Sequence, residues 1–309
     1  MQLHSHAPRD AGARTRRASV LSVLLLSLAL AAAGAWARAD AASNSFLWKA
    51  SRGQSIVYLV GSVHLLSKDY YPLSPVLDAA FSESDLLVEE VDLGEMETAD
   101  SQLQILMRGM LPSGQALDKV IAPATLAMVS RRVSDLGLPL EPLKRFKPWM
   151  LALTLLGLEW QKAGFDPNLG LDKHFYDRAR AEGKQVQGLE TLDFQLSRFD
   201  DMTMDEQDRM LSSTLKELET QKAAVTALAD AWRNGDAATV ERIVLQDLKQ
   251  EPRMYQALLV DRNRDWLPKI DALFARRGRA FIVVGAAHLV GPDGLIAMLR
   301  AKGYTVEQL

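Results

Sequence analysis

The sequence predicts an α/β fold with a central, mostly parallel β-sheet whose strands come from both ends of the chain. The first observation is a repeated segment, an apolar run followed by Gly-x-x-His, at residues 56–64 and again at 281–288. Apolar runs rich in Val and Ile are typical of strands buried on both faces. The second observation is that helical spacing of apolar residues dominates between about residues 96 and 250. We therefore expect one sheet with a large helical insertion between its two halves.

Residues 1–39 have the three-part layout of a secretory signal peptide. Arginines at positions 14, 16 and 17 precede an apolar stretch from Val20 to Trp36, and small residues follow. A retained membrane anchor is the alternative, but the stretch is rich in alanine and barely long enough to span a bilayer. We expect the leader to be removed, which leaves a mature domain of residues 40–309, exported to the periplasm or secreted, with no stable membrane span.

The composition narrows the possible chemistry. With 309 residues and 48% apolar content, the chain can bury a large core. It contains no cysteine, which excludes disulfides, thiolate metal ligands and cysteine nucleophiles. The formal net charge of −3 becomes more negative once the arginine-rich leader is removed, which argues against nucleic acid as a partner. Any metal must be held by histidine, carboxylate or amide oxygen.

The amino-terminal half of the sheet is expected to be one β-α-β unit. The first Gly-x-x-His strand is followed by a helix in residues 72–82 and a second strand in residues 85–92. Within the insertion, apolar spacing of i, i+3 and i+4 predicts helices, and a glycine-led turn near Gly183 feeds a short strand that ends at Glu190. These helices are expected in residues 126–136, 149–160, 171–182 and 210–228.

The carboxyl-terminal part returns to an alternation of helices and strands. A helix through Trp266 and Leu273 precedes the strand 280–284 and the second Gly-x-x-His segment. A helix in residues 292–302 and a last strand in residues 304–309 complete the chain.

His64 and His288 each lie directly after a predicted strand. In open α/β sheets, ligands bind at the carboxyl ends of the strands, so these two side chains are expected to meet at one edge of the sheet. The alternative is two independent core histidines. Three acids at the end of the second strand strengthen the first interpretation, because Glu89, Glu90 and Asp92 would repel one another unless a cation or a hydrogen-bond network held them. Side-chain alternation puts Glu90 and Asp92 on one face and Glu89 on the other.

Six short motifs follow one another along the chain. They are Gly61-Ser-Val-His64, Val88-Glu-Glu-Val-Asp92, Gly170-Leu-Asp172, Gly188-Leu-Glu190-Thr191, Asp261-Arg262-Asn263 and Val284-Gly-Ala-Ala-His288-Leu-Val-Gly-Pro292. In this order, from about Phe46 to Leu309, the chain resembles the TraB/PrgY/GumN family, which includes the Tiki proteases. The resemblance implies a fold similar to that of erythromycin-esterase-like and ChaN-like proteins, and a metal-dependent peptidase activity for Tiki members.

The resemblance also implies roles for single residues. The implied metal ligands are His64, His288 and Glu90; Glu90 is favoured over Glu89 because it precedes Val91-Asp92, as the family's Glu-x-Asp motif requires. His174 has no counterpart and is expected to be incidental. Supporting or substrate-orienting roles fall to Asp172, Glu190, Arg262 and Asn263.

Two imidazoles and a carboxylate would leave open positions on a divalent ion such as manganese, cobalt or zinc, where bound water could attack a carbonyl. Glu190 or Asp92 could then act as general base, and Arg262 suits a developing oxyanion or a substrate carboxylate. An ordinary surface or helix-capping role for Arg262 remains open. So does a metal-free mechanism, in which a histidine polarised by Glu90 acts as the base.

The sequence therefore predicts an exported, peptidase-like hydrolase that acts on a peptide or a small carbonyl-containing substrate. One alternative is a secreted, non-catalytic protein of the same fold that binds a ligand or peptide. A second is a degenerate enzyme retained for contacts with a partner, against which the intact histidine pair argues.

Overall fold

The computed structural model describes residues 45–220, 222–246 and 248–309. All of them belong to one compact unit that ends at Leu309. The expected leader, residues 1–39, lies outside the described residues.

Six strands form one sheet in the order β4-β3-β5-β2-β1-β6. Neighbours from β4 to β2 pair in parallel, whereas β1 pairs antiparallel with both β2 and β6. The expected α/β class with a mostly parallel sheet is confirmed, and β5, from the carboxyl-terminal part, lies between β2 and β3 from the amino-terminal part. The strands are β1 (Leu47–Arg52), β2 (Ser55–Ser62), β3 (Leu86–Glu89), β4 (Gln185–Gly188), β5 (Ala280–Gly285) and β6 (Thr305–Gln308).

The register of β2 and β5 brings the two Gly-x-x-His segments together. Val60 lies opposite Val283 and Ser62 lies opposite Gly285, so both strands leave the sheet at the same edge. Both are apolar and almost fully buried, as expected of central strands.

Strand β1 is absent from the sequence-based expectations. It forms a hairpin with β2 through a turn in which Gly53 adopts a left-handed conformation, and it pairs on its other side with β6. Its alternating, partly polar sequence, LWKASR, gives no continuous apolar signal. Its place in the sheet depends on pairing with strands from both ends of the chain.

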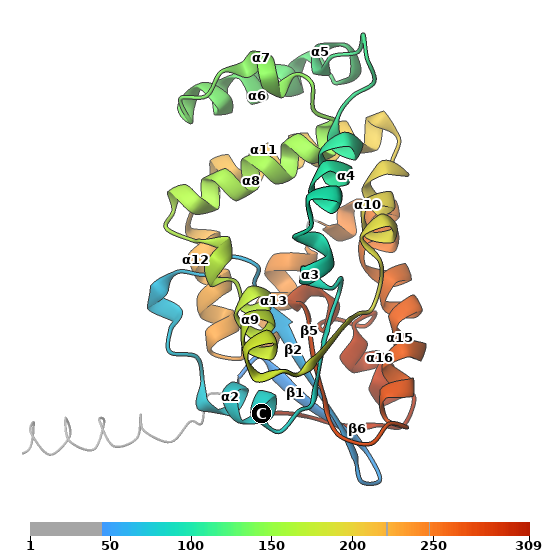
Figure 1. The fold of residues 1–309 in the computed structure, drawn as a ribbon. Coiled ribbons are helices and arrows are strands. Elements are labelled where there is room, and N and C mark those ends of the chain that lie inside the picture. The colour runs from blue at the N-terminus through green and yellow to red at the C-terminus, as the bar shows by residue number, and fades with distance from the viewer. Residues whose placement is uncertain (1–44, 221, 247) are drawn as a thin grey trace, which may run out of the picture. The chain divides into compact units, whose positions relative to one another are not determined.

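Helices cover the sheet and extend beyond it. Figure 1 shows α5, α6 and α7 farthest from the sheet, with α8 and α11 between them and the sheet. The predicted helices are confirmed in position, except that residues 210–228 fall in two helices, α11 and α12. The helices up to α9 are α2 (Pro75–Ser82), α3 (Leu93–Met96), α4 (Ala99–Gly109), α5 (Leu117–Val120), α6 (Pro123–Asp135), α7 (Leu140–Leu143), α8 (Pro148–Lys162) and α9 (Leu171–Glu182).

The remaining helices follow in chain order. They are α10 (Leu192–Asp200), α11 (Met204–Thr220), α12 (Lys222–Arg233), α13 (Ala237–Leu245), α14 (Pro252–Tyr255), α15 (Asp261–Leu273) and α16 (Leu295–Ala301). The short 3-10 helices are η1 (Lys68–Tyr70), η2 (Pro167–Leu169), η3 (Leu248–Gln250) and η5 (Ala286–His288), and η4 (Gln256–Val260) is a π-helix.

The helical region has a hydrophobic core of its own. Side chains of α6, α8 and α11, among them Val129, Leu151 and Leu211, form a buried cluster separate from the core around the sheet. Between these helices in the sequence, α9 and β4 return to the sheet. The short strand expected within the insertion at about residues 96–250 is thus present as β4, and it joins the sheet beside β3.

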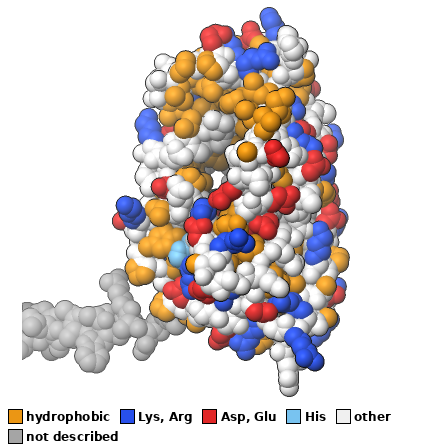
Figure 2. Space-filling model, in the orientation of Figure 1, with side chains coloured by type: hydrophobic (Ala, Val, Ile, Leu, Met, Phe, Trp, Pro, Cys, Tyr) orange, Lys and Arg blue, Asp and Glu red, His pale blue; other side chains and the backbone are white. Residues whose placement is uncertain are grey.

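Helix α4 turns an apolar face outward. Leu103, Leu106 and Met107, at i, i+3 and i+4 spacing, are 58%, 48% and 65% exposed. Figure 2 shows apolar side chains gathered over this upper part of the molecule. Among the described residues, no helix combines the length and apolar character needed to cross a membrane.

Candidate functional site

His64, Glu90 and His288 converge on Gly285 at the end of β5. A side-chain carbon placed on Gly285 would lie 3.2 Å from Glu90 Oε1, 3.6 Å from His64 Nε2 and 3.7 Å from His288 Cδ2. The structure thus brings together the two histidines and the glutamate singled out from the sequence. They meet at the carboxyl edge of the sheet, where open α/β sheets bind ligands.

His64 is held by Asp172, the first acidic residue of α9. The His64 Nδ1 and Asp172 Oδ2 atoms lie 2.8 Å apart, and the side chain of His64 remains 60% exposed. Gly170 makes this contact possible, because a side chain there would collide with the backbone carbonyl of His64. The spacing of Gly170-Leu-Asp172 thus lets the backbone approach His64 while Asp172 bonds its ring. Asp172 raises the pKa of His64 to about 9, so the ring is protonated at neutral pH in the metal-free protein.

His288 is buried, and Asn263 fixes its tautomer. The side-chain nitrogen of Asn263 donates to the backbone carbonyls of His288, at 3.2 Å, and of Asp293, at 2.8 Å. Its oxygen therefore faces His288 Nδ1, 2.7 Å away, and can only accept. His288 carries its proton on Nδ1 and presents a lone pair on Nε2. Burial, with the charges of Arg262 and His64, lowers the pKa of His288 to about 3 against the opposing effect of Glu90.

Glu90 is an ionised carboxylate held at both oxygens. Oε1 accepts from the backbone N–H of Gly285 at 2.7 Å. Oε2 accepts from Arg262 Nη2 at 2.6 Å and from Gln195 Nε2 at 3.1 Å. Burial alone would raise the pKa of Glu90, but Arg262 and the two histidines hold that pKa well below its usual range. Oε1, the atom nearer to His288 Nε2 at 3.9 Å, faces the space above Gly285.

Arg262 is buried, and its donors are all engaged. Its Nε and Nη2 atoms donate to Glu190, and Nη2 also donates to Glu90. Its Nη1 atom donates to the carbonyl of Leu258 at 3.2 Å and to His288 Nε2 at 3.1 Å. Arg262 is thus neither a surface nor a capping arginine, and the arrangement leaves it no N–H for a substrate oxyanion. Its place in the site is to hold two carboxylates and a histidine.

Glu190 is buried beneath this network. Besides Arg262, it accepts from Trp266 Nε1 at 2.8 Å. Burial raises the pKa of Glu190 against the opposing effect of these donors. Since both oxygens are bonded, Glu190 supports Arg262 in this arrangement and is not placed to take a proton from water.

The other two acids expected at the end of the second strand, Glu89 and Asp92, do not point into the site. Strand β3 ends at Glu89, earlier than the expected 85–92, because Asp92 already caps α3 by accepting from the backbone N–H of Gly94 at 2.8 Å. Glu89 is 2% exposed, and burial raises its pKa to about 9, so it is protonated at neutral pH. His174 packs against Tyr71 and takes no part in the site.

Two residues of the site are missing from the sequence-based expectations. Trp266, fully buried, bonds Glu190, and its ring lies 4.4 Å from the ring of His288. Gln195, on α10, bonds Glu90. Trp266 follows Asn263 by three positions and therefore shares its helix face, which is the one signal that could have identified it. Nothing in the sequence around Gln195 distinguishes it.

The donor set fits a divalent cation by chemistry and charge. Imidazole and carboxylate are ligands for manganese, cobalt and zinc. Glu90, Glu190 and Asp172 bring three negative charges and Arg262 one positive charge, which leaves negative charge in excess when the histidines are neutral. Within the described ranges, no three such side chains are already drawn together as ligands. Arg262 Nη1 donates to both His288 Nε2 and the carbonyl of Leu258, so an ion held by His288 Nε2 would have to displace the first of these contacts.

Comparison with known proteins gives one family and uncharacterised relatives. Residues 46–308 match the TraB/PrgY/gumN family. An uncharacterized protein of Escherichia coli (strain K12), YbaP, is 25% identical over 261 residues, which cover 83% of this chain and 94% of that protein. An uncharacterized protein of Treponema pallidum (strain Nichols) is 22% identical over 273 residues, covering 82% and 80% of the two chains. No solved structure matches.

Proposed function

This chain belongs to the TraB/PrgY/gumN family, and on that premise we propose that it is an exported, metal-dependent hydrolase of the peptidase-like type. Its substrate is a peptide or a small carbonyl-containing molecule, and its fold is of the erythromycin-esterase and ChaN type. The observation that carries the proposal is the convergence of His64, Glu90 and His288 within 4 Å of one point above Gly285.

The proposed ligands of the divalent ion are His64 Nε2, His288 Nε2 and Glu90 Oε1. When bound, such an ion lowers the pKa of water and polarises the substrate carbonyl. Residues of the chain orient the two histidine rings. Asp172 and Asn263 each hold the Nδ1 side of one histidine, which points both Nε2 atoms away from these partners. His288 Nε2 accepts from Arg262 Nη1, a contact that a bound ion would have to displace.

Proton transfer falls to the exposed side of the site. Glu190 and Arg262 are engaged with each other, whereas the His64 and Asp172 pair is open to solvent. In this proposal, solvent at this open side takes up the proton that hydrolysis releases, since both ring nitrogens of His64 are engaged, and Arg262 keeps Glu90 ionised and in place. Burial of His288 under Trp266 keeps bulk water from its inner side.

Metal binding and turnover test the proposal separately. Metal-free protein should bind about one Mn²⁺, Co²⁺ or Zn²⁺ ion in calorimetric titrations, and His64→Ala, His288→Ala and Glu90→Gln should each weaken that binding at least tenfold. His174→Ala is the matched control, because it removes a histidine outside the site. Stoichiometric binding that survives both histidine changes would overturn the metal assignment.

Peptide and ester libraries then test turnover, with and without each ion. Hydrolysis that depends on the metal and is lost in His288→Ala supports the proposal. A ligand that stabilises the protein against heat but yields no product would instead favour the non-catalytic binding protein.

A further inference from the structure

A pocket of about 610 Å³ lies between the helices that cover the carboxyl edge of the sheet. Residues of α8 line it from Leu156 to Lys162, with Ala163 directly after the helix, and α11 lines it at i, i+3, i+4, i+7 and i+8 from Met210. Each helix therefore contributes about two turns of wall, roughly 10 Å along its axis. We call this pocket the slot; its volume is in the range of pockets that hold small organic ligands.

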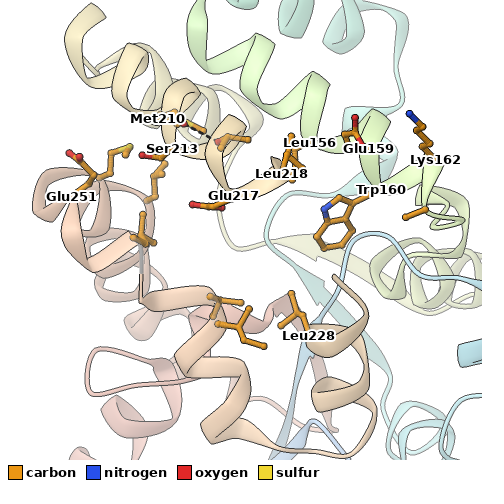
Figure 3. Close-up of a pocket in the computed structure, with 17 residues that line it drawn as sticks. Leu156, Glu159, Trp160, Lys162, Met210, Ser213, Glu217, Leu218, Leu228 and Glu251 are labelled. Atoms are coloured by element: carbon orange, nitrogen blue, oxygen red, sulfur yellow. Dashed lines mark hydrogen bonds between the residues drawn. The ribbon is translucent and has the colours of Figure 1, made fainter. Parts of the chain in front are cut away.

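Most residues that line the slot are apolar. The polar lining residues include Glu217 and Glu251, and Glu251 is paired with Arg209 at 3.1 Å. Figure 3 shows Trp160 and Leu228 entering it from different walls, with Leu156 and Leu218 beside them. The charged groups of Glu159 and Lys162 point away from the space, and Glu159 is engaged with Arg132 at 3.2 Å.

The slot adjoins the elements that hold the candidate site. Leu258, which lines the slot, accepts from Arg262 Nη1 through its carbonyl. Helix α13, which contributes Val244 to the wall, packs against η5, the short helix that carries His288. Two independent connections thus join the slot to the residues around Gly285.

We infer that the slot binds a linear, uncharged aliphatic chain carried by the substrate. Assignment to a substrate rests on the proposed function, whereas binding of the chain does not. An anionic group would lose its hydration there and would face the carboxylates of Glu217 and Glu251. A peptide backbone would leave many of its N–H and C=O groups unpaired against the apolar part of these walls. Thr214 is already engaged, since it donates to the carbonyl of Met210. A methylene chain has no such groups to satisfy.

Alkyl maltosides of increasing chain length test the inference on the full protein. Hexyl, octyl and decyl maltoside, titrated below their micelle concentrations, should bind with an affinity that rises about fourfold per added methylene. Equal affinity for the three chain lengths would overturn the inference. So would an acetylated trileucine amide that binds as tightly as octyl maltoside.

Two slot variants locate the binding. Ser213→Phe fills the slot and should weaken binding of octyl maltoside at least tenfold, whereas Ser212→Phe, the same change one position away and outside the lining, should not. Leu218→Gln keeps the side-chain volume but adds a polar group, and it should weaken binding of octyl maltoside severalfold. This variant tests the inference even if the larger side chain of Ser213→Phe disturbs folding. Unchanged affinity in both slot variants, with melting temperatures like that of the parent, would overturn the inference.

The experiment separates the slot from the proposed function. Binding of Mn²⁺ should be unchanged in Leu218→Gln, since none of the proposed ligands lies in the slot. If affinity depends on chain length but the protein neither binds metal nor hydrolyses a substrate, the inference about the slot is supported and the proposed hydrolase function is rejected. If the protein binds metal and hydrolyses a substrate but its affinity does not depend on chain length, the inference about the slot is overturned and the proposed hydrolase function is retained.

Discussion

Arg262 Nη2 donates to Glu90 Oε2 at 2.6 Å, across 172 residues of sequence. The contact ties α15 to the residue that directly follows β3. Both side chains are almost fully buried, and Glu190 shares the same guanidinium at 2.7 Å. A buried guanidinium is well suited to this task, because its planar fork donates to two carboxylates at once.

Arg262→Lys should destabilise the protein by about 3 kcal/mol, because an ammonium group cannot replace the fork and leaves buried carboxylates without donors. Urea unfolding followed by circular dichroism measures the loss. Arg279→Lys, which alters a largely exposed ion pair with Glu83, is the control and should cost less than about 1 kcal/mol. Equal small effects for the two changes would contradict the structural role assigned to Arg262.

Gly285→Ala should leave the fold intact and block the site. The backbone at Gly285 has φ −50°, which alanine accepts, yet the new methyl group would occupy the space between Glu90 Oε1 and His64 Nε2. Affinity for Mn²⁺ should fall at least tenfold by calorimetry, while the melting temperature stays close to that of the parent. Gly157→Ala, on α8 with open space around it, is the matched control. Undiminished affinity in Gly285→Ala would show that ligands bind elsewhere.

Asn263→Leu should weaken the preference of the His288 ring for the Nδ1–H tautomer. The change removes the acceptor at Nδ1 and the donor to two backbone carbonyls, so only Arg262 Nη1, which donates to Nε2, still favours the Nδ1–H form. Metal affinity should fall about 10- to 100-fold, and nitrogen chemical shifts of the ring should report a larger share of the Nε2–H form than in the parent. Asn168→Leu, at an exposed position in η2, serves as control. An unchanged share of the Nδ1–H form together with unchanged metal affinity would refute this account.

Asp172→Asn should lower the pKa of His64 from about 9 toward its ordinary value of 6.5 in the metal-free protein. Because the folded-state pKa is raised, the pair stabilises the fold fully below pH 6.5 and loses this effect as the pH rises through about 9. The stability difference between parent and variant should therefore be largest in acid and vanish in base. It should stay below about 1 kcal/mol, since the ring is 60% exposed. NMR titration of the ring measures the pKa, and a difference that grows with pH would reverse the assignment.

Local patterns predicted much of this arrangement. The repeated strand and Gly-x-x-His segment placed both histidines at one edge of the sheet, because parallel strands end together. The family motif distinguished Glu90 from Glu89, and the structure turns the first toward Gly285 and buries the second. Strand β1 could not be predicted from local patterns, because it is stabilised by pairing with β2 and β6 and its composition is not typical of a buried strand.

The sequence by itself determined the fold class, the order of the strands' apolar runs and the residue types at the sheet edge, since these follow from short-range periodicity and from where strands end. Only the tertiary structure decided what each side chain does. Arg262 holds Glu90, Glu190 and His288, Trp266 and Gln195 join the site, and a slot lies between α8, α11 and α13. The physical reason is that hydrogen-bond partners and cavities are set by which distant elements pack together, and no local pattern encodes that packing.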